Sequence, residues 1–212
     1  MKKIPSLCTS RSVEIYQGML WFRRMFYEDS VFFKMSDFWE MLCEDSEYFS
    51  IKTYHSNQRD DYKRKGGVIA FNGHIILTVD HQLIVNAKHG CGFHNFMLAH
   101  EFGHIALDHY AKSAMTKNFQ LFKGSNGMMS NSPPTIEELE ADYAAVFFQC
   151  GVALEDKRRS AKELARRAFS DERIVEKAQS RVQLDVFRQR LIKRQRKRVI
   201  LSYSPILGQE LA

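Results

Sequence analysis

Residues 98–109 read LAHEFGHIALDH, and this stretch decides how the rest of the sequence is interpreted. His100 and His104 stand four positions apart, and Glu101 directly follows the first of them. The apolar residues around them continue with helical spacing over 93–111, which predicts a helix. On a helix, positions i and i+4 project from one face about one turn apart, so both imidazoles can reach one metal ion. The stretch therefore predicts a helix that presents a metal site.

The three polar residues have a chemical reason to stand at this spacing. A catalytic zinc ion takes three protein ligands and keeps a fourth position for water, which it acidifies toward neutral pH. A carboxylate beside the first ligand can accept a proton from that water and deliver it to a leaving amine, the role we assign to Glu101. The alternative is a fortuitous pattern on a helix face, so the interpretation depends on a third ligand. His109, just past this helix, is interpreted as an ordinary polar residue rather than an oxyanion donor.

A third ligand is available in the helix predicted from TIEELEADYAAVFFQC, residues 135–150. Glu138 and Asp142 are four positions apart and share a face, so Glu138 can complete the site while Asp142 orients a ligand histidine. Glu140 is the alternative ligand. Thr135 and Glu138 also fit a capping box, in which Glu138 would bind the Thr135 backbone instead. If the helix begins earlier, at Ser-Pro, the Glu138 carboxylate is free for metal.

The residues ahead of the motif helix predict a β-hairpin. Residues 68–71 and 74–79 are apolar and flank Asn72-Gly73, a dipeptide that suits a tight type I′ turn. Residues 82–87, QLIVNA, are expected to form a third strand. The chain thus predicts a small antiparallel sheet in front of the motif helix.

Helices are expected at both ends of the chain. We predict one over 11–29 and a second over 37–49 with Ser36 as its cap. One or two basic amphipathic helices should follow between 156 and 198, with an apolar side formed by Ala165, Phe169, Ile174, Ala178, Val182, Val186 and Leu191. Residues 55–67 and 112–134 are predicted loops. The fold class is therefore α+β, with the antiparallel sheet packed on the motif helix and on the Glu138 helix, and with helical terminal segments.

The net charge of +6 is unevenly distributed along the chain. Residues 157–198 hold 16 Lys and Arg against 5 Asp and Glu, a balance of +11, so the remainder carries −5. We predict a metallopeptidase-like domain over 1–155 and a basic helical extension over 156–212 that packs on the same domain. The basic excess favours an acidic partner. A weak nucleic-acid contact by this segment is one expectation, although a solvated basic helix end is the commoner interpretation.

The remaining composition indicates a cytoplasmic protein. The four cysteines form no CxxC motif and no disulfide framework, which is typical of reduced thiols. The start of the chain is basic but lacks the apolar segment of a signal peptide. No stretch approaches the about 18 apolar residues of a membrane span, so no membrane partner is expected.

Taken together, FMLAHEFGHIALDH and EELEADYAA, preceded by the predicted strands, resemble the ImmA/IrrE family of bacterial and phage zinc metallopeptidases over roughly residues 66–150. The resemblance implies a compact α+β fold and one zinc ion. His100, His104 and Glu138 match the family's ligand positions, and Glu101 matches its general base. The wider gluzincin group shares the ExxxD form of the third-ligand helix, which favours Glu138 over Glu140.

The resemblance also implies a biological role. Members of the family cleave or otherwise inactivate a helix-turn-helix repressor encoded nearby, which releases stress-response or mobile-element genes. We therefore expect a zinc endopeptidase with a narrow protein substrate. The alternative is a regulatory protein that keeps the zinc fold but binds a repressor or DNA without cleavage. Glu101 favours the enzyme, because a binding module has no need of a base beside the metal.

Overall fold

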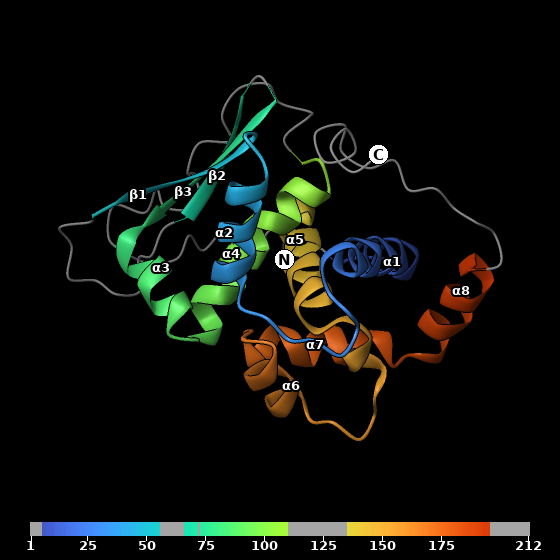
Figure 1. Cartoon of the computed structure of the whole chain (residues 1–212). Coiled ribbons are helices and arrows are strands. Elements are labelled where there is room, and N and C mark those ends of the chain that lie inside the picture. Colours follow the sequence, from blue (N-terminus) through green and yellow to red (C-terminus); the bar gives the residue numbers. More distant parts are fainter. Residues whose placement is uncertain (1–5, 56–65, 72, 110–134, 196–212) are drawn as a thin grey trace, which may run out of the picture.

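The computed structural model describes residues 6–55, 66–71, 73–109 and 135–195 (Figure 1). Within these ranges the helices are α1 (Thr9–Phe26), α2 (Met35–Asp45), α3 (His81–Lys88), α4 (Gly92–Ala106), α5 (Ile136–Cys150), α6 (Ala161–Arg167), α7 (Glu172–Val182) and α8 (Asp185–Gln195), with a 3₁₀-helix, η2 (Gly151–Glu155), directly after α5. The strands are β1 (Phe49–Tyr54), β2 (Gly66–Phe71) and β3 (His74–Asp80). The α+β class is as predicted, and the described part of the chain is mostly helical.

The sheet of the described residues is mixed, in the order β1-β3-β2. The predicted hairpin is confirmed, because β2 and β3 pair antiparallel with Val68 opposite Leu77, and Gly73 has the positive φ of +80° that its turn needs. The prediction of an all-antiparallel sheet is wrong. The third strand is β1, which pairs in parallel with β3 and places Phe49 opposite Ile75.

The strand predicted for residues 82–87 is also wrong, because these residues belong to helix α3. The carboxylate of Asp80 accepts a hydrogen bond from the backbone N–H of Gln82 at 2.9 Å and so caps the helix. Leu83 and Ala87, one helical turn apart, are both fully buried. A cap and two buried positions at i and i+4 outweigh the β-propensity of the short apolar run.

Helices cover the sheet and then pack on one another (Figure 1). In β3, Ile75, Leu77 and Val79 are buried, and α2, α3 and α4 contact β1, β3 and β2 respectively. Beyond the sheet, α4 packs most extensively against α5, and α5 packs against α1. Helix α4 therefore lies between the sheet and α5, so side chains on two of its sides face different parts of the core.

A group of phenylalanines joins three of these helices. The rings of Phe102 in α4 and Phe148 in α5 have centroids 4.6 Å apart, and the ring of Phe38 in α2 lies 5.0 Å from each of them. All three side chains are fully or almost fully buried. Contacts of this kind fix α4 against α5, and α4 and α5 are the two helices that carry the predicted site.

The N-terminus of α2 is capped by tertiary structure and not by Ser36, which lies inside the helix. The side-chain oxygen of Asn95, in α4, accepts a hydrogen bond from the backbone N–H of Met35 at 2.7 Å. The hydroxyl of Ser36 instead bonds the carboxylate of Asp37 at 3.1 Å. Because Asn95 comes from a distant part of the chain, the sequence around α2 could not reveal this cap.

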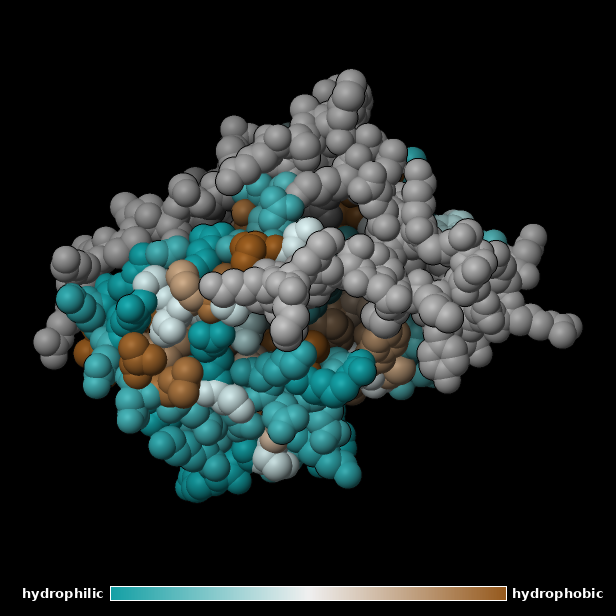
Figure 2. Space-filling model, turned by 180° about the vertical axis from the view of Figure 1, so that it is seen from behind, coloured by the Kyte–Doolittle hydropathy of each residue, from teal (hydrophilic) through white to brown (hydrophobic). Residues whose placement is uncertain are grey.

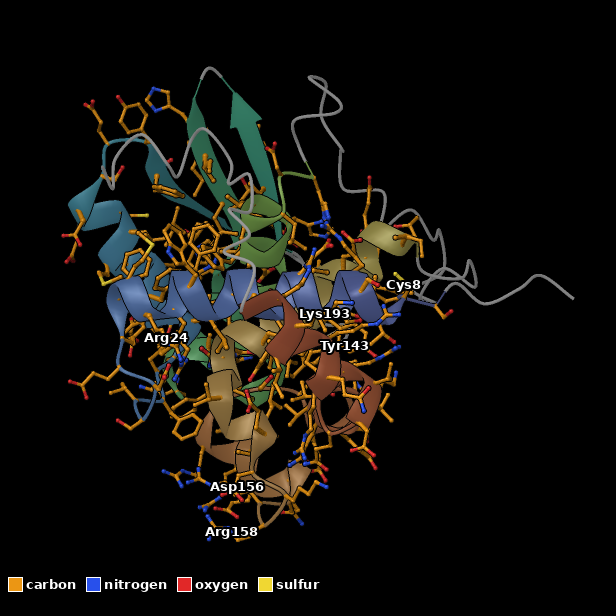
Figure 3. All side chains as sticks on the ribbon, turned by 90° about the vertical axis from the view of Figure 1, so that its right-hand side faces the viewer. Cys8, Arg24, Tyr143, Asp156, Arg158 and Lys193 are labelled. Atoms are coloured by element: carbon orange, nitrogen blue, oxygen red, sulfur yellow. The ribbon has the colours of Figure 1, made fainter. Side chains whose placement is uncertain are left out.

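Residues 156–195 form three helices, more than the one or two predicted. Helix α7 contacts α5, and α8 contacts α1, beside which the labelled Lys193 lies in Figure 3. Most of the predicted apolar side is buried or half-buried, but Val186 is 45% exposed and the next residue, Phe187, is buried in its place. The Phe187 ring packs edge-on against Tyr16 of α1 at 5.6 Å.

The described surface is largely hydrophilic with small separate apolar areas (Figure 2). The lower part of that view, where α6 and α7 lie, is almost entirely hydrophilic. None of the helices in the described residues is both long enough and apolar enough to span a membrane. Of the predicted loop 55–67, residues 66 and 67 belong to β2 and residues 56–65 lie outside the described residues, as does the predicted loop 112–134.

Candidate metal centre

Helix α4 carries His100 and His104 on the side that faces α5. The helix is shorter than predicted, because it ends at Ala106 and not at residue 111. The missing side chain of Gly103 lets α4 approach α5 closely. A Cβ atom added to Gly103 would stand 2.9 Å from the carbonyl oxygen of Ala141, closer than real Cβ contacts allow. Gly103 therefore brings the backbones together at the level of the histidines.

Three donor atoms converge between the two helices. The Nε2 atoms of His100 and His104 are 3.1 Å apart, and the carboxylate oxygens of Glu138, in α5, lie 3.1 Å from the first and 3.6 Å from the second. Two ligand atoms held about 2.1 Å from one ion at the tetrahedral angle stand roughly 3.4 Å apart. The observed separations are close to that value, so the donor set fits a single zinc-sized ion, and these three residues are the group among the described residues that could hold a metal ion.

Asp142 contacts the outer nitrogen of His100. Its carboxylate oxygen lies 3.0 Å from Nδ1 of His100, one turn of α5 beyond Glu138. Burial disfavours a charged His100, but the hydrogen bonds to Asp142 and Glu138 and the charge of Glu101 outweigh burial and raise the pKa of His100 to about 10. An environment that holds a proton this strongly also attracts a cation.

The Glu138 carboxylate is directed to the histidines although its backbone takes part in a helix cap. Thr135 is the N-cap of α5, and its hydroxyl accepts a hydrogen bond from the N–H of Glu138 at 3.2 Å. Burial favours the neutral carboxyl, but the hydrogen bonds from His100 and His104 outweigh it and hold the pKa of Glu138 well below its usual value. The Thr135 half of the predicted capping box is therefore formed, while the Glu138 carboxylate contacts the two histidines.

His109 contacts His104, and no local pattern in the sequence indicated this contact. The chain leaves α4 and turns at Asp108, whose φ is +56°, so that His109 comes back against the helix. Nδ1 of His109 lies 2.8 Å from Nδ1 of His104. His109 is buried and contacts a histidine of the site, which the interpretation as an ordinary polar residue past the helix did not include.

Glu140 lies behind His109 and outside the donor triangle. Its carboxylate is 3.1 Å from Nε2 of His109 and accepts two hydrogen bonds of 2.8 Å from the guanidinium of Arg11, in α1. Burial favours the neutral carboxyl, but Arg11 and His109 outweigh it and lower the pKa of Glu140 to about 2. The structure therefore brings Glu138 to both histidines and engages Glu140 with other partners.

The outer contacts leave the inner nitrogens of both histidines available. An ionised carboxylate only accepts hydrogen bonds, so Asp142 keeps a proton on Nδ1 of His100, and a metal that binds Nε2 would replace the second proton that His100 holds there. The Glu140 carboxylate accepts a hydrogen bond from the N–H at Nε2 of His109. If that is the only ring proton of His109, its Nδ1 accepts a hydrogen bond from the N–H at Nδ1 of His104. Both imidazoles are in this way prepared to offer Nε2 to a metal.

Glu101 lies beside the first histidine and is buried, with 8% of its surface exposed. Its negative charge is one of the influences that raise the pKa of His100, so the carboxylate stands near the imidazole. This is the location that the sequence assigned to a general base.

No family model, no curated protein and no solved structure matches this chain.

Proposed function

We propose that this protein is a zinc-dependent endopeptidase. The observation that supports the proposal is the donor triangle of His100, His104 and Glu138, in which both histidines have their outer nitrogens engaged. Two imidazoles and one carboxylate are the ligand set of many catalytic zinc sites and leave a coordination position open for reaction. Zinc is preferred over magnesium or calcium because imidazole nitrogen suits it and those harder cations prefer oxygen.

The chain's own residues have the following roles in this proposal. A zinc ion bound here would supply a Lewis acid that activates water and polarises a peptide carbonyl. Glu101 accepts a proton as the water oxygen forms its bond to the carbonyl carbon. The C–N bond then breaks, and Glu101 gives that proton to the leaving amine nitrogen. Asp142 holds the His100 ring throughout.

The sheet offers a way to hold an extended peptide near the site. In the order β1-β3-β2, strand β2 has no further strand beside it among the described residues, and β2 is the strand that α4 contacts. An extended chain can add to such an edge through main-chain hydrogen bonds. We place the substrate there, with its scissile bond over the three ligands.

The substrate we propose is a helix-turn-helix repressor, and this step rests on the motif resemblance to the ImmA/IrrE family. A second candidate function is a non-cleaving regulator that binds the repressor or DNA. The basic residues between 157 and 194 favour it, since several, such as Arg158 before α6 and Arg173 in α7, are largely exposed. The two functions differ in whether Glu101 is required.

The test compares wild type with Glu101→Gln, which keeps the shape of the side chain and removes the base, and with Glu137→Gln as a control that makes the same substitution in α5. Each protein is reconstituted with zinc, its metal content is measured, and it is incubated with the helix-turn-helix protein encoded beside its gene. The proposal expects about one zinc per chain in all three and cleavage by wild type and the control alone. Stable binding without cleavage supports the regulator, and no zinc in any of them overturns both functions.

A further inference from the structure

We infer that His109, Glu140 and Arg11 position the metal ligand His104, so that the N-terminal helix α1 is part of the metal centre. The inference rests on the proposed function, because it assigns these residues to the same site. It goes beyond the three ligands and the Asp142 contact, because none of these three residues is itself a ligand. His109 contacts His104, Glu140 contacts His109, and Arg11 contacts Glu140.

The contacts form one continuous series. His104 Nδ1 is 2.8 Å from His109 Nδ1, His109 Nε2 is 3.1 Å from Glu140, and Glu140 accepts both hydrogen bonds of Arg11 at 2.8 Å. The side chains of His109 and Glu140 are only 7% and 10% exposed. Arg11 and Glu140 are 129 positions apart in the sequence, so this series exists only in the folded chain.

The series has a direction, and that direction is what prepares His104. Arg11 can only donate hydrogen bonds, so it keeps Glu140 as an acceptor. Glu140 therefore requires a proton on Nε2 of His109. If that is the only ring proton of His109, its Nδ1 has a lone pair that accepts a hydrogen bond from the N–H at Nδ1 of His104. With its ring proton on Nδ1, His104 can offer Nε2 to a metal. A metal bound to Nε2 of His104 also requires the ring proton to be on Nδ1. The hydrogen-bond series and metal binding therefore favour the same tautomer of His104.

A simpler role would be a structural tie between α1 and α5. Such a tie would contribute to stability, but it would not control which nitrogen of His104 carries the proton. The informative substitution is Glu140→Gln, because an amide presents one oxygen and one N–H₂ group. Either orientation turns the N–H₂ group toward Arg11, which is also a donor, so the fixed direction of the series is lost.

The matched control is Glu14→Gln. Glu14 lies on α1 and is the other carboxylate near Arg11, at 3.5 Å, and it also binds Arg194 of α8. Glu14→Gln removes the negative charge of a second carboxylate beside Arg11, but it leaves the contact between Glu140 and His109 in place. A second variant, His109→Phe, keeps a ring of similar size and removes the acceptor for His104. Circular dichroism and thermal unfolding confirm that each protein is folded.

Two measurements test the inference on the full-length protein. Long-range ¹H–¹⁵N correlation spectra of the metal-free protein show which imidazole nitrogen is protonated, and competition with a chromophoric chelator gives zinc affinity. We expect a proton on Nδ1 of His104 in wild type and Glu14→Gln, and loss of this preference in Glu140→Gln. Zinc affinity should fall about 10- to 100-fold in Glu140→Gln and His109→Phe and stay unchanged in Glu14→Gln.

The outcomes separate this inference from the proposed function. Wild-type tautomer and affinity in Glu140→Gln, even with lower thermal stability, would overturn the positioning role and leave the peptidase proposal intact. The tautomer of His104 could change as expected in Glu140→Gln while neither wild type nor any variant binds zinc. That result would support the hydrogen-bond series and overturn the zinc proposal. Equal loss of affinity in Glu14→Gln and Glu140→Gln would also count against the inference, because general charge removal would then explain the effect.

Discussion

The backbone of Gly103 in α4 lies directly against the backbone of Ala141 in α5. A Cβ atom at Gly103 would come within 2.9 Å of the Ala141 carbonyl oxygen and 3.2 Å of the Ala144 methyl group. The nearer atom belongs to the backbone and cannot rotate away. This single contact sets the separation of the two helices that carry the donor triangle, because His104 follows Gly103 and Asp142 follows Ala141.

Replacing Gly103 with alanine should therefore destabilise the protein and weaken metal binding together. Alanine gains about 1 kcal/mol of helix propensity, but overpacking costs about 1 to 3 kcal/mol and is at its upper end against a backbone atom. We expect a net loss of about 1 to 2 kcal/mol in urea unfolding and a zinc affinity below that of wild type. A variant more stable than wild type with full affinity would show that the helices separate without cost.

Glu138→Ala should abolish specific zinc binding. Glu138 supplies the carboxylate of the donor triangle, so its removal should cost more than the about 10- to 100-fold typical of an outer hydrogen-bond partner. The helix cap remains, because Thr135 accepts its bond from the backbone N–H of residue 138. Calorimetric titration with zinc measures the effect, with Glu137→Ala as the control in the same helical turn. Equal affinity of the two variants would remove Glu138 from the ligand set.

Removal of zinc should lower the thermal stability of the wild-type protein. A ligand present at 100 times its dissociation constant and bound by the folded state alone adds about 2.7 kcal/mol. For a chain of 212 residues this corresponds to a Tm higher by about 5 to 10 °C. Calorimetric scans with zinc and with a chelator measure the difference, and the Glu138→Ala protein should show little of it. A chelator that leaves Tm unchanged in wild type would argue against a stabilising metal.

Arg23→Met should be more destabilising than its neighbour Arg24→Met. Arg23 is fully buried and donates hydrogen bonds to the carbonyls of Phe148 at 2.8 Å and Gln149 at 3.1 Å, near the end of α5, and to the carbonyl of Val31. Its loss leaves these acceptors unpaired, and relief of the buried charge offsets only part of that cost.

The expected loss for Arg23→Met is about 2 to 3 kcal/mol in urea unfolding. Arg24 forms an exposed ion pair with Asp29 at 2.8 Å, so Arg24→Met should cost at most about 1 kcal/mol. The labelled Arg24 lies on the outside of α1 in Figure 3. Similar losses for the two variants would show that the buried guanidinium contributes no more than a surface charge.

The stability of the protein should fall at alkaline pH through Tyr16. Burial, and next the hydrogen bond of 2.6 Å that its hydroxyl donates to Glu155, raise the pKa of Tyr16 above its usual value. The folded state therefore holds the phenolic proton after the unfolded state has released it. This contribution is complete below the unfolded pKa of about 10 and declines above it, by up to about 1.4 kcal/mol per pH unit.

Tyr16→Phe provides the comparison for this prediction. Phenylalanine keeps the ring contact with Phe147, whose centroid is 5.0 Å from that of Tyr16, and lacks the ionising hydroxyl. The difference in unfolding free energy between wild type and Tyr16→Phe should be constant from pH 7 to about 9 and shrink toward pH 11. A difference independent of pH throughout would mean that Tyr16 ionises equally in both states.

Local sequence determined the elements whose signals are short-range. Asn72-Gly73 predicted the hairpin because the turn depends on the conformations of adjacent residues, and the predicted helix end at residue 150 is followed by Gly151, whose φ is +55°. The i, i+4 spacing of His100 and His104, and of Glu138 and Asp142, predicted which residues share a helix face. Helical geometry alone is enough for that conclusion.

Other features were decided by contacts between distant segments. The run 82–87 has β-propensity but becomes α3, and the third strand is β1, whose parallel pairing with β3 leaves no turn signal in the sequence. Asn95 rather than Ser36 caps α2 for the same reason. The third strand and the cap of α2 depend on partners far away along the chain, where periodicity and propensity carry no information, whereas the cap of α3 is the nearby Asp80.

The site shows both kinds of determination. The sequence by itself determined that two histidines, a following glutamate and a second acidic helix were present, because their spacing is local. Only the tertiary structure decided that Glu138 meets the histidines while Glu140 meets His109 and Arg11. Residues 138 and 140 are two positions apart, so on a helix they point to different sides, and which side faces α4 depends on how α5 packs. Packing of buried apolar surface sets that rotation, and no short stretch of sequence contains it.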